Sequence, residues 1–194
     1  MTVGLTGQSG AGKTTVSEVF KRRGFAVINC DLVAREVTEA GSECCKALAL
    51  LFPDCFDEAF ALDRAKLAQA VFSDREKLKI LDDAIYPFIT ERIKEHIAVL
   101  SRENDNILLD APTLYEAGAD SLCDKVVGVI ADDCVRLRRV TARDGITEEQ
   151  ALKRFSSQHS AEFFEHRCNY VIDNSFDIAL AEKETDRIID KLLY

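Results

Sequence analysis

The stretch Gly7-Gln8-Ser9-Gly10-Ala11-Gly12-Lys13-Thr14 matches the pattern G-x-x-x-x-G-K-[ST] at each of its fixed positions. An apolar run, Val3-Gly4-Leu5-Thr6, precedes it, and residues 15–22 follow with the spacing of a helix. A strand, a glycine-rich loop and a helix in this order form a phosphate-binding loop, because glycines let backbone N–H groups approach phosphate oxygens. The stretch therefore predicts a site for a nucleoside triphosphate.

Each residue type in this loop has a predicted task. Lys13 would reach the β- and γ-phosphates as a point charge, and the Thr14 hydroxyl would ligate Mg²⁺. The helix that begins near Lys13 adds the positive end of its dipole. The residues that we expect to hold ATP in and beside this loop are Gly7, Gly10, Ala11, Gly12, Lys13, Thr14 and Thr15.

Length and charge limit the class of protein. A chain of 194 residues fits a single α/β domain, with room for a helical insertion. The formal net charge of −9 argues against non-specific binding to nucleic acid or to a membrane surface, both of which favour basic proteins. We therefore expect a small-molecule substrate, no nucleic-acid or membrane partner, and a monomer or a weak homo-oligomer.

The cysteines indicate the cellular compartment. The chain has seven of them, an odd number, and no two have C-x-x-C spacing. The phosphate-binding loop occupies the region where a secretory signal would need an apolar core, and the longest apolar runs are too short to span a bilayer. We expect a reduced cytoplasmic protein whose cysteines act as small core residues.

Further apolar runs rich in β-branched residues predict buried strands. Segments with helical periodicity separate them, so the chain is predicted to form a three-layer α/β/α core with a five-stranded parallel sheet. The last helix is expected over residues 177–192, with Ile178, Leu180, Ala181, Ile188 and Ile189 facing inward. The four further strands are Phe25–Asn29, Ile107–Asp110, Lys125–Ile130 and Tyr170–Asp173.

A long helical segment interrupts this alternation. It occupies about residues 32–103, far more than the dozen or so that a crossover between parallel strands needs, and leaves residues 1–31 and 104–194 as the core. We expect it to bind the second substrate, because ligands bind beyond the carboxyl ends of parallel strands. Pro87 is expected in the first turn of a new helix, where its missing N–H costs nothing. The expected helices are Val33–Thr38, Ser42–Leu51, Asp63–Phe72, Asp74–Ala84 and Pro87–Arg102.

A second helical feature, over about residues 134–160, is rich in arginine. Gly145 separates two helices, and Thr147-Glu148-Glu149-Gln150 has the pattern of a capping box. Residues 135–154 contain six basic and three acidic side chains. Arg136, Arg139 and Arg143 share one helix face by spacing. This face is either simply solvated or, as we favour, part of a lid that supplies positive charge to a transferring phosphoryl group.

Two aspartates follow predicted strands. Asp31 comes directly after Val27-Ile28-Asn29-Cys30 and would orient the attacking hydroxyl, although it would serve equally as the N-cap of the next helix. Asp110 ends Ile107-Leu108-Leu109 and is placed to hold Mg²⁺ directly or through water. Arg35 either binds an anionic substrate or is exposed, with neither favoured by the sequence.

These segments together resemble dephospho-CoA kinases. The similarity runs through the phosphate-binding loop, the Val27–Asp31 and Ala34–Val37 segments, Tyr86-Pro87-Phe88-Ile89, residues 110–116, Arg143–Thr147 and Val171–Asn174, nearly the whole chain in order. Enzymes of that family transfer the γ-phosphoryl group of ATP to the ribose 3′-hydroxyl of dephospho-CoA, the last step of coenzyme A synthesis. The resemblance implies a nucleotide-kinase-like core, a helical CoA-binding insertion and a lid.

The resemblance also assigns roles to residues. It implies that Asp31 is the base near the 3′-hydroxyl, that Arg139 and Arg143 belong to the lid, and that Asn174 lies near the adenine of ATP. It implies that Pro112, Leu114 and Glu116 help to shape the acceptor site. The chain departs from the family pattern at Asn29, where aspartate is usual, at Cys30, at Tyr86, where histidine is usual, and at Gln8, where glycine is common.

Two other functions are compatible with a phosphate-binding loop. A nucleoside or nucleotide kinase of the same fold shares the loop and the lid, and differs in its acceptor site. A nucleotide-dependent switch would transfer nothing to a small molecule, but guanine-specific switches need [NT]-K-x-D and usually D-x-x-G, and neither pattern occurs. The long insertion and the Asp110–Glu116 segment favour dephospho-CoA as the acceptor.

Overall fold

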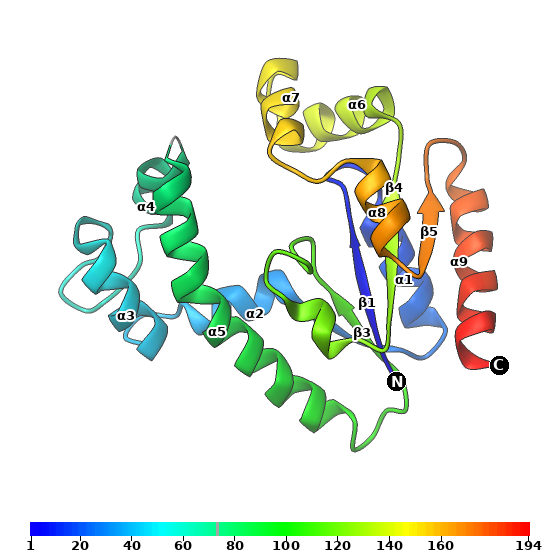
Figure 1. The fold of residues 1–194 in the computed structure, drawn as a ribbon, viewed down its shortest axis with the longest axis horizontal. Helices are drawn as coiled ribbons and strands as arrows, with labels where there is room; N and C mark the ends of the chain where they lie inside the picture. Colours follow the sequence, from blue (N-terminus) through cyan, green and yellow to red (C-terminus); the bar gives the residue numbers. More distant parts are fainter. Residues whose placement is uncertain (73) are drawn as a thin grey trace. The chain divides into compact units, whose positions relative to one another are not determined.

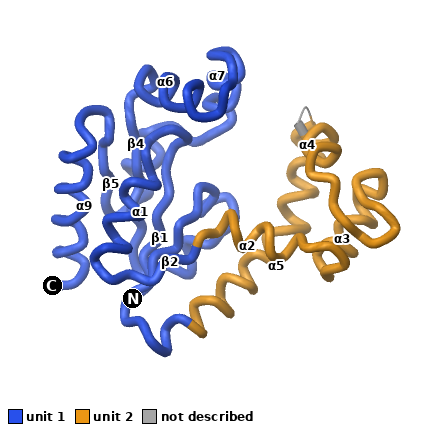
Figure 2. Tube along the Cα trace, turned by 180° about the vertical axis from the view of Figure 1, so that it is seen from behind, with its two compact units in different colours: residues 1–28, 100–194 blue, residues 29–99 orange. Residues whose placement is uncertain are grey.

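The chain divides into two compact units. The computed structural model describes residues 1–72 and 74–194. Residues 1–28 and 100–194 form the larger unit, and residues 29–99 form the smaller one (Figure 2). Each unit has its own secondary structure and is described separately.

The larger unit is built on a five-stranded parallel sheet, as predicted (Figure 1). Each strand lies within a residue or two of its predicted range. The strand order is β2-β3-β1-β4-β5, so β1, which leads into the phosphate-binding loop, is central. The strands are β1 (Thr2–Gly7), β2 (Ala26–Asn29), β3 (Ile107–Asp110), β4 (Lys125–Ile130) and β5 (Tyr170–Asp173).

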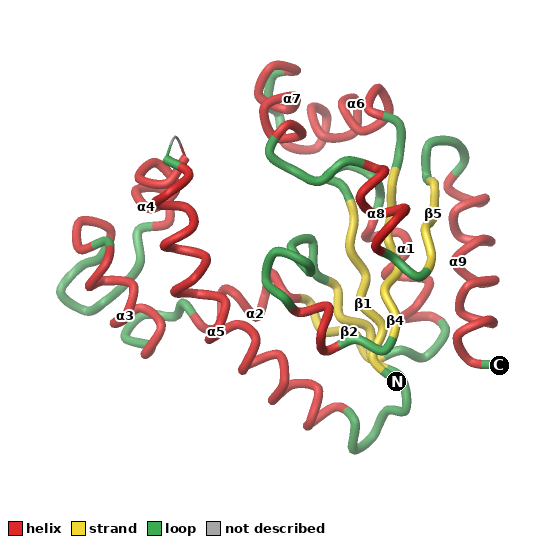
Figure 3. The backbone as a smooth tube through the Cα atoms, in the orientation of Figure 1, coloured by secondary structure: helices red, strands yellow, loops and turns green. Residues whose placement is uncertain are grey.

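Both faces of this sheet are covered, because neighbouring residues of a strand point to opposite sides. On one face, Val3 and Leu5 of β1 pack in a core with residues of α1 (Lys13–Arg22) and α9 (Ile178–Leu193). On the other face, Gly128 of β4 lies against Phe164 of α8 (Ala161–Arg167). This arrangement confirms the three-layer α/β/α fold (Figure 3).

The arginine-rich segment after β4 forms the two expected helices. They are α6 (Asp133–Asp144) and α7 (Glu148–Ser156), and Gly145 ends α6 at a φ of 65°. The capping box is confirmed, since Thr147 N donates to Gln150 Oε1 (2.9 Å) and Gln150 N donates to Thr147 Oγ1 (3.2 Å). A short 3₁₀ helix, η2 (Ala119–Leu122), precedes β4.

The prediction for the C-terminal helix is partly wrong. Asp177 caps α9, and Ala181, Ile188 and Ile189 are buried as expected, but Ile178 and Leu180 are exposed. Leu180 lies off the buried stripe, which has helical spacing from Ala181 onward. Ile178 lies in the first turn beside the cap, so the helical pattern alone overestimates how far the packed face extends.

The smaller unit is helical. Its helices are α2 (Cys30–Val37), α3 (Glu43–Leu51), η1 (Pro53–Cys55), α4 (Arg64–Phe72) and α5 (Arg75–Leu100), the last of which ends in the larger unit. Phe52, Cys55 and Leu67 form a buried cluster within it. Helices α2, α3 and α4 lie close to the ranges predicted from the sequence.

Pro87 is where that prediction fails. Instead of starting a new helix, Pro87 lies inside α5, which continues from Arg75 to Leu100. A proline inside a helix removes one backbone hydrogen bond and costs about 3 kcal/mol. The helix nevertheless continues because its next turns bury Ile89 and Ile93, which stabilises the helical course beyond the proline.

An ion-pair cluster joins α2 to α5 within the smaller unit. Glu36 of α2 accepts from Nε (3.0 Å) and Nη2 of Arg92, and its other carboxylate oxygen lies 2.9 Å from His96 Nε2. Hydrogen bonds from Arg92 and then His96 lower the pKa of Glu36 to about 2. The cluster fixes the helix that carries Asp31 and Arg35.

This cluster predicts acid sensitivity of the smaller unit. A carboxyl group whose pKa is lowered by folding stabilises the folded state above its unfolded pKa, 4.5, and loses that contribution as the pH falls toward about 2. We expect Glu36→Gln to lower the free energy of unfolding at pH 6 and to have a shrinking effect below pH 4.5, as measured by urea denaturation. Glu91→Gln, which removes an exposed pair with Lys94 on the same helix, is the control. An effect of Glu36→Gln that did not change with pH would contradict this prediction.

Candidate active site

The phosphate-binding loop runs from the end of β1 at Gly7 to the start of α1 at Lys13. Gly7 and Gly12 show why the structure requires glycine in this loop. Gly7 has a φ of 147°, and a Cβ there would collide with the Val129 backbone. Gly12 has a φ of 94°, and a Cβ there would collide with Asn174 Nδ2. The loop therefore keeps its course only with glycine at these positions.

Side chains hold the carbonyl groups of the loop. Arg136 Nε donates to Ser9 O (3.0 Å), Arg139 Nη1 lies 3.4 Å from Gly10 O, and Asn174 Nδ2 donates to Ala11 O (2.7 Å). In the first turn of α1, Thr15 N donates to Gly12 O (3.0 Å). The amides of Lys13 and Thr14 precede it at the helix N-terminus, where N–H groups have no carbonyl partner within the helix and can bind phosphate oxygens.

Lys13 and Asp110 form a part-buried ion pair beside the loop. Lys13 is the first residue of α1, and Asp110 ends β3, which pairs with β1 so that Asp110 lies opposite Leu5. Asp110 is only 7% exposed. The structure thus brings together the two residues predicted to bind phosphate and metal.

The predicted metal ligands suit Mg²⁺ in their chemistry. Thr14, in the first turn of α1, is exposed, and Asp110 supplies carboxylate oxygens next to Lys13. Among residues 1–72 and 74–194, no group of three or more His, Cys, Asp or Glu side chains is placed to hold a metal ion. Mg²⁺ is commonly bound by one or two protein oxygens together with substrate phosphates, so this sparse donor set fits it.

Asn174 packs directly against the loop. It follows β5, its backbone N–H donates to Ile130 O (2.9 Å), and its side chain is 2% exposed. Within the described part of the chain, its Oδ1 has no hydrogen-bond partner. A buried acceptor without a partner is costly, and a ligand with an N–H donor would satisfy it.

The lid arginines do not share one environment. Arg136 is 2% exposed, which rules out the alternative of a simply solvated face at this residue, and Arg139 reaches the loop carbonyls. Arg143 instead donates to Asp144, through Nε (2.7 Å) and Nη2 (3.0 Å), as does Arg154. Arg143 and then Arg154 hold the pKa of Asp144 well below its usual range. Arg143 is therefore engaged within the hairpin.

The segment after β3, residues 111–118, is fixed against α8. Pro112 O accepts from Thr6 Oγ1 (3.3 Å), and Leu114 is fully buried, so Leu114 supports the segment rather than facing a substrate. Tyr115 packs edge-on against Phe163 (5.3 Å between ring centroids), and its hydroxyl donates to Arg167 O (3.0 Å). Burial, followed by the hydrogen bond with Cys168, raises the pKa of Tyr115.

Glu116 of this segment lies 3.5 Å from His159 Nε2. His159 also stacks on Phe163 with 3.6 Å between ring centroids. The sequence alone indicates no role for His159, because the histidine has no metal-ligand spacing and Glu116 lies in a distant segment of the chain. The contact became visible only when the fold brought residues 116 and 159 together.

Asp31 and Arg35 belong to the smaller unit, on α2. Asn29, not Asp31, caps this helix, since Asn29 Oδ1 accepts from Leu32 N (3.1 Å). This rules out the alternative in which Asp31 serves as the N-cap and gives a structural task to the asparagine found where the family usually has aspartate. Asp31 and Arg35 are both exposed, one helical turn apart, on one face of α2.

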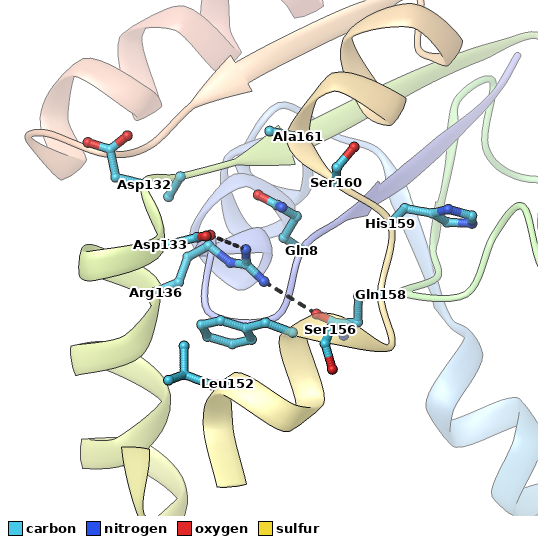
Figure 4. Close-up of a pocket in the computed structure, with 12 residues that line it drawn as sticks. Gln8, Asp132, Asp133, Arg136, Leu152, Ser156, Gln158, His159, Ser160 and Ala161 are labelled. Carbon is cyan, nitrogen blue, oxygen red and sulfur yellow. Dashed lines mark hydrogen bonds and ion pairs between the residues drawn. The ribbon is translucent and has the colours of Figure 1, made fainter. Parts of the chain in front are cut away.

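Residues around Gln8 form a part of the site that sequence reasoning missed. A cavity of about 640 Å³ lies between α6, α7 and the start of α8 (Figure 4). Gln8, Arg136 and Gln158 line it, and they contact one another or the loop backbone. A glutamine at position 8 was visible only as a departure from a common glycine. No signal in the sequence pairs it with residues 136 and 158.

None of the helices in the described residues is long and apolar enough to cross a membrane.

Comparisons with known proteins show which family this chain resembles. The family model described as dephospho-CoA kinase matches residues 1–179. The dephospho-CoA kinase of Syntrophotalea carbinolica is 36% identical over 191 residues, which cover 97% of this chain and 89% of that protein. The dephospho-CoA kinase of Lactobacillus johnsonii is 30% identical over 192 residues, 98% of this chain and 97% of the relative.

Solved structures show the same fold. A crystal structure from Thermus thermophilus has a TM-score of 0.83 and 31% identity, over 99% of this chain and 97% of the other. Dephospho-CoA kinase from Campylobacter jejuni has a TM-score of 0.63 and 25% identity, over 98% and 96%. Shikimate kinase from Bacteroides thetaiotaomicron (TM-score 0.55, 14% identity, 100% and 99% covered) shares the fold alone.

Proposed function

The chain belongs to the dephospho-CoA kinase family, and from this premise we propose how its residues share the work of phosphoryl transfer. The enzyme transfers the γ-phosphoryl group of ATP to the ribose 3′-hydroxyl of dephospho-CoA, which gives coenzyme A and ADP and completes coenzyme A synthesis. The observation that carries the assignment of the donor site is the Lys13–Asp110 pair beside a loop whose carbonyls are tied back by side chains.

Lys13 binds the β- and γ-phosphates in this proposal. In the structure it is paired with Asp110, so binding of the triphosphate replaces the carboxylate of Asp110 by phosphate oxygens as the partner of Lys13. Asp110 and the Thr14 hydroxyl would hold Mg²⁺, which when bound would supply positive charge to the phosphates.

Arg139 is the lid residue best placed to act on the phosphates. It lies 3.4 Å from Gly10 O and 3.5 Å from Ala11 O, long contacts that are readily exchanged for a charged oxygen. Arg143 would join it only by leaving Asp144. We therefore assign the larger part of transition-state stabilisation to Lys13 and Arg139. Asn174, whose buried Oδ1 has no partner in the described residues, accepts from the adenine amino group.

Asp31 orients the acceptor hydroxyl and takes up its proton. Asn29 caps α2, so the carboxylate of Asp31 is not used in capping. Arg35, one turn later on the same face, binds an anionic group of dephospho-CoA. Pro112 and Glu116 shape the acceptor site from the segment held against α8.

In this proposal the enzyme is a monomer or a weak homo-oligomer in the cytoplasm. The seven cysteines are free thiols, which suits a reducing compartment.

An acceptor panel tests this function. Purified protein with Mg-ATP is expected to release ADP with dephospho-CoA and to form coenzyme A in equal amount, whereas AMP, CMP, UMP and shikimate give only the background rate. Coenzyme A itself, whose 3′-position is already phosphorylated, is the matched control and should be inert. Faster ADP release with a nucleoside or nucleotide than with dephospho-CoA would contradict the proposed acceptor.

A further inference from the structure

Arg136 is a buried cation on the lid helix α6. It is 2% exposed, and its guanidinium carbon lies 4.0 Å above the centre of the Phe155 ring in α7. Burial lowers the pKa of its guanidinium, and Asp133 partly offsets this effect. A buried arginine is tolerated only when its N–H groups are paired, so its partners indicate its task.

Each of the three guanidinium nitrogens of Arg136 donates a hydrogen bond within the protein. Nε donates to Ser9 O (3.0 Å). Nη1 donates to Asp133 Oδ1 (2.7 Å) and Nη2 to Gln158 Oε1 (3.4 Å) (Figure 4). With the Gln8 amide turned to satisfy its surroundings, its oxygen accepts from Arg136 Nη1 (3.0 Å) and from Ala161 N (3.2 Å). Four of the five N–H donors of the guanidinium are thus used within the protein, on a residue that is 2% exposed.

Gln158 completes the arrangement from the other side. Its Oε1 accepts from Ser9 N at 3.1 Å, while Arg136 binds Ser9 O. Ser9 therefore has both its N–H and its carbonyl tied to side chains more than a hundred residues away in the chain. Gln8 adds a link from the same turn of the loop to the first residue of α8.

We propose that Arg136, Gln158 and Gln8 are positioning residues that hold the backbone of the phosphate-binding loop in its triphosphate-binding shape without touching the nucleotide. The physical basis is preorganisation: a loop that is already ordered loses less conformational entropy when ATP binds. This inference rests on the proposed donor site, because it concerns the same loop. In this proposal Arg136 connects helix α6 to the phosphate-binding loop.

The first test compares two arginines of one helix. Arg136→Met removes the guanidinium and keeps an apolar chain against Phe155, and Arg138→Met removes an exposed arginine whose Nε lies 3.4 Å from Cys134 O. We expect Arg136→Met to weaken ADP and ATP binding by about tenfold in calorimetric titrations, while KM for dephospho-CoA stays unchanged. Arg138→Met should bind both nucleotides as the native protein does. Equal affinities in the two variants, or a parallel rise in KM for both substrates, would overturn the proposal.

A second pair of variants decides the question if Arg136→Met does not fold, as judged by circular dichroism and melting temperature. Gln158→Glu keeps an acceptor oxygen for Ser9 N and Arg136, whereas Gln158→Met removes it; Gln158 is exposed, so neither is expected to unfold the protein. Native ADP affinity in Gln158→Glu and weaker affinity in Gln158→Met support the proposal. Equal ADP affinity in the two variants contradicts it. ADP binding is measured without an acceptor, so the result is independent of the acceptor assignment.

Discussion

Replacing Lys13 by alanine is expected to lower kcat/KM for ATP by at least about a hundredfold, because a positive charge aimed at the transferring phosphoryl group is lost. Binding of ATP should weaken as well, since the lysine contacts the phosphates in both the ground state and the transition state. Steady-state kinetics together with calorimetric titration of ATP separate the two effects. Lys21→Ala, an exposed lysine in the last turn of the same helix, is the control and should leave both quantities unchanged.

The Lys13–Asp110 pair adds a second consequence. In Lys13→Ala the carboxylate of Asp110, 7% exposed, loses its partner, so the melting temperature should fall. Adding Asp110→Asn removes the unpaired charge and is expected to recover part of the stability but none of the activity. Kinetics of Lys13→Ala that match those of the native enzyme would contradict the assignment of the phosphate-binding loop.

Replacing Asp31 by asparagine is expected to lower kcat by about a hundredfold or more, the range for loss of a general base. Asparagine keeps the size and the polarity of the side chain but cannot take up the proton of the hydroxyl. ATP binding should be little changed, because Asp31 acts on the acceptor. The measurement is coenzyme A formation at saturating concentrations of both substrates, with ATP affinity from a separate titration.

Asn29 makes this test of Asp31 clean. Because Asn29 caps α2, Asp31→Asn should leave the melting temperature close to that of the native protein. Glu43→Gln is the matched control, since Glu43 is an exposed acid in the first turn of α3 in the same unit. It should change neither activity nor stability. Full turnover in Asp31→Asn would show that its carboxylate has no part in the reaction.

The donor half of the site was predictable from sequence because its contacts are local. The pattern from Gly7 to Thr14 fixes a strand, a turn and a helix within a few residues, and the structure has β1 and α1 on either side of it. The ends of the strands were also predictable from the sequence, and Asp110 ends β3 as expected. Apolar runs of this length between helical segments have few alternatives to a parallel sheet.

Two expectations based on local sequence rules differ from the structure. Pro87 matched the rule for a first-turn proline, yet α5 continues through it. For Asp31 the sequence left two roles open, and the structure removes the N-cap role because Asn29, two residues earlier, takes it. In α5 the burial of Ile89 and Ile93 stabilises the helix beyond the proline, and in α2 the side chain of Asn29 rather than that of Asp31 accepts from Leu32 N.

The sequence by itself determined that this chain binds a triphosphate on a parallel sheet and, through its chain-long resemblance, that it is a dephospho-CoA kinase. It could not determine which arginine of α6 faces the phosphates. The three-residue spacing of Arg136 and Arg139 puts both on one face of α6. Only the fold brings Ser9 and Gln158 into contact with Arg136 and buries that arginine. Spacing along a helix is a local property, whereas the burial of Arg136 and its hydrogen bonds depend on Ser9 and Gln158, which come from other segments of the chain. The proposed distinction between an arginine that anchors the loop and one that binds the nucleotide therefore rests on the tertiary structure.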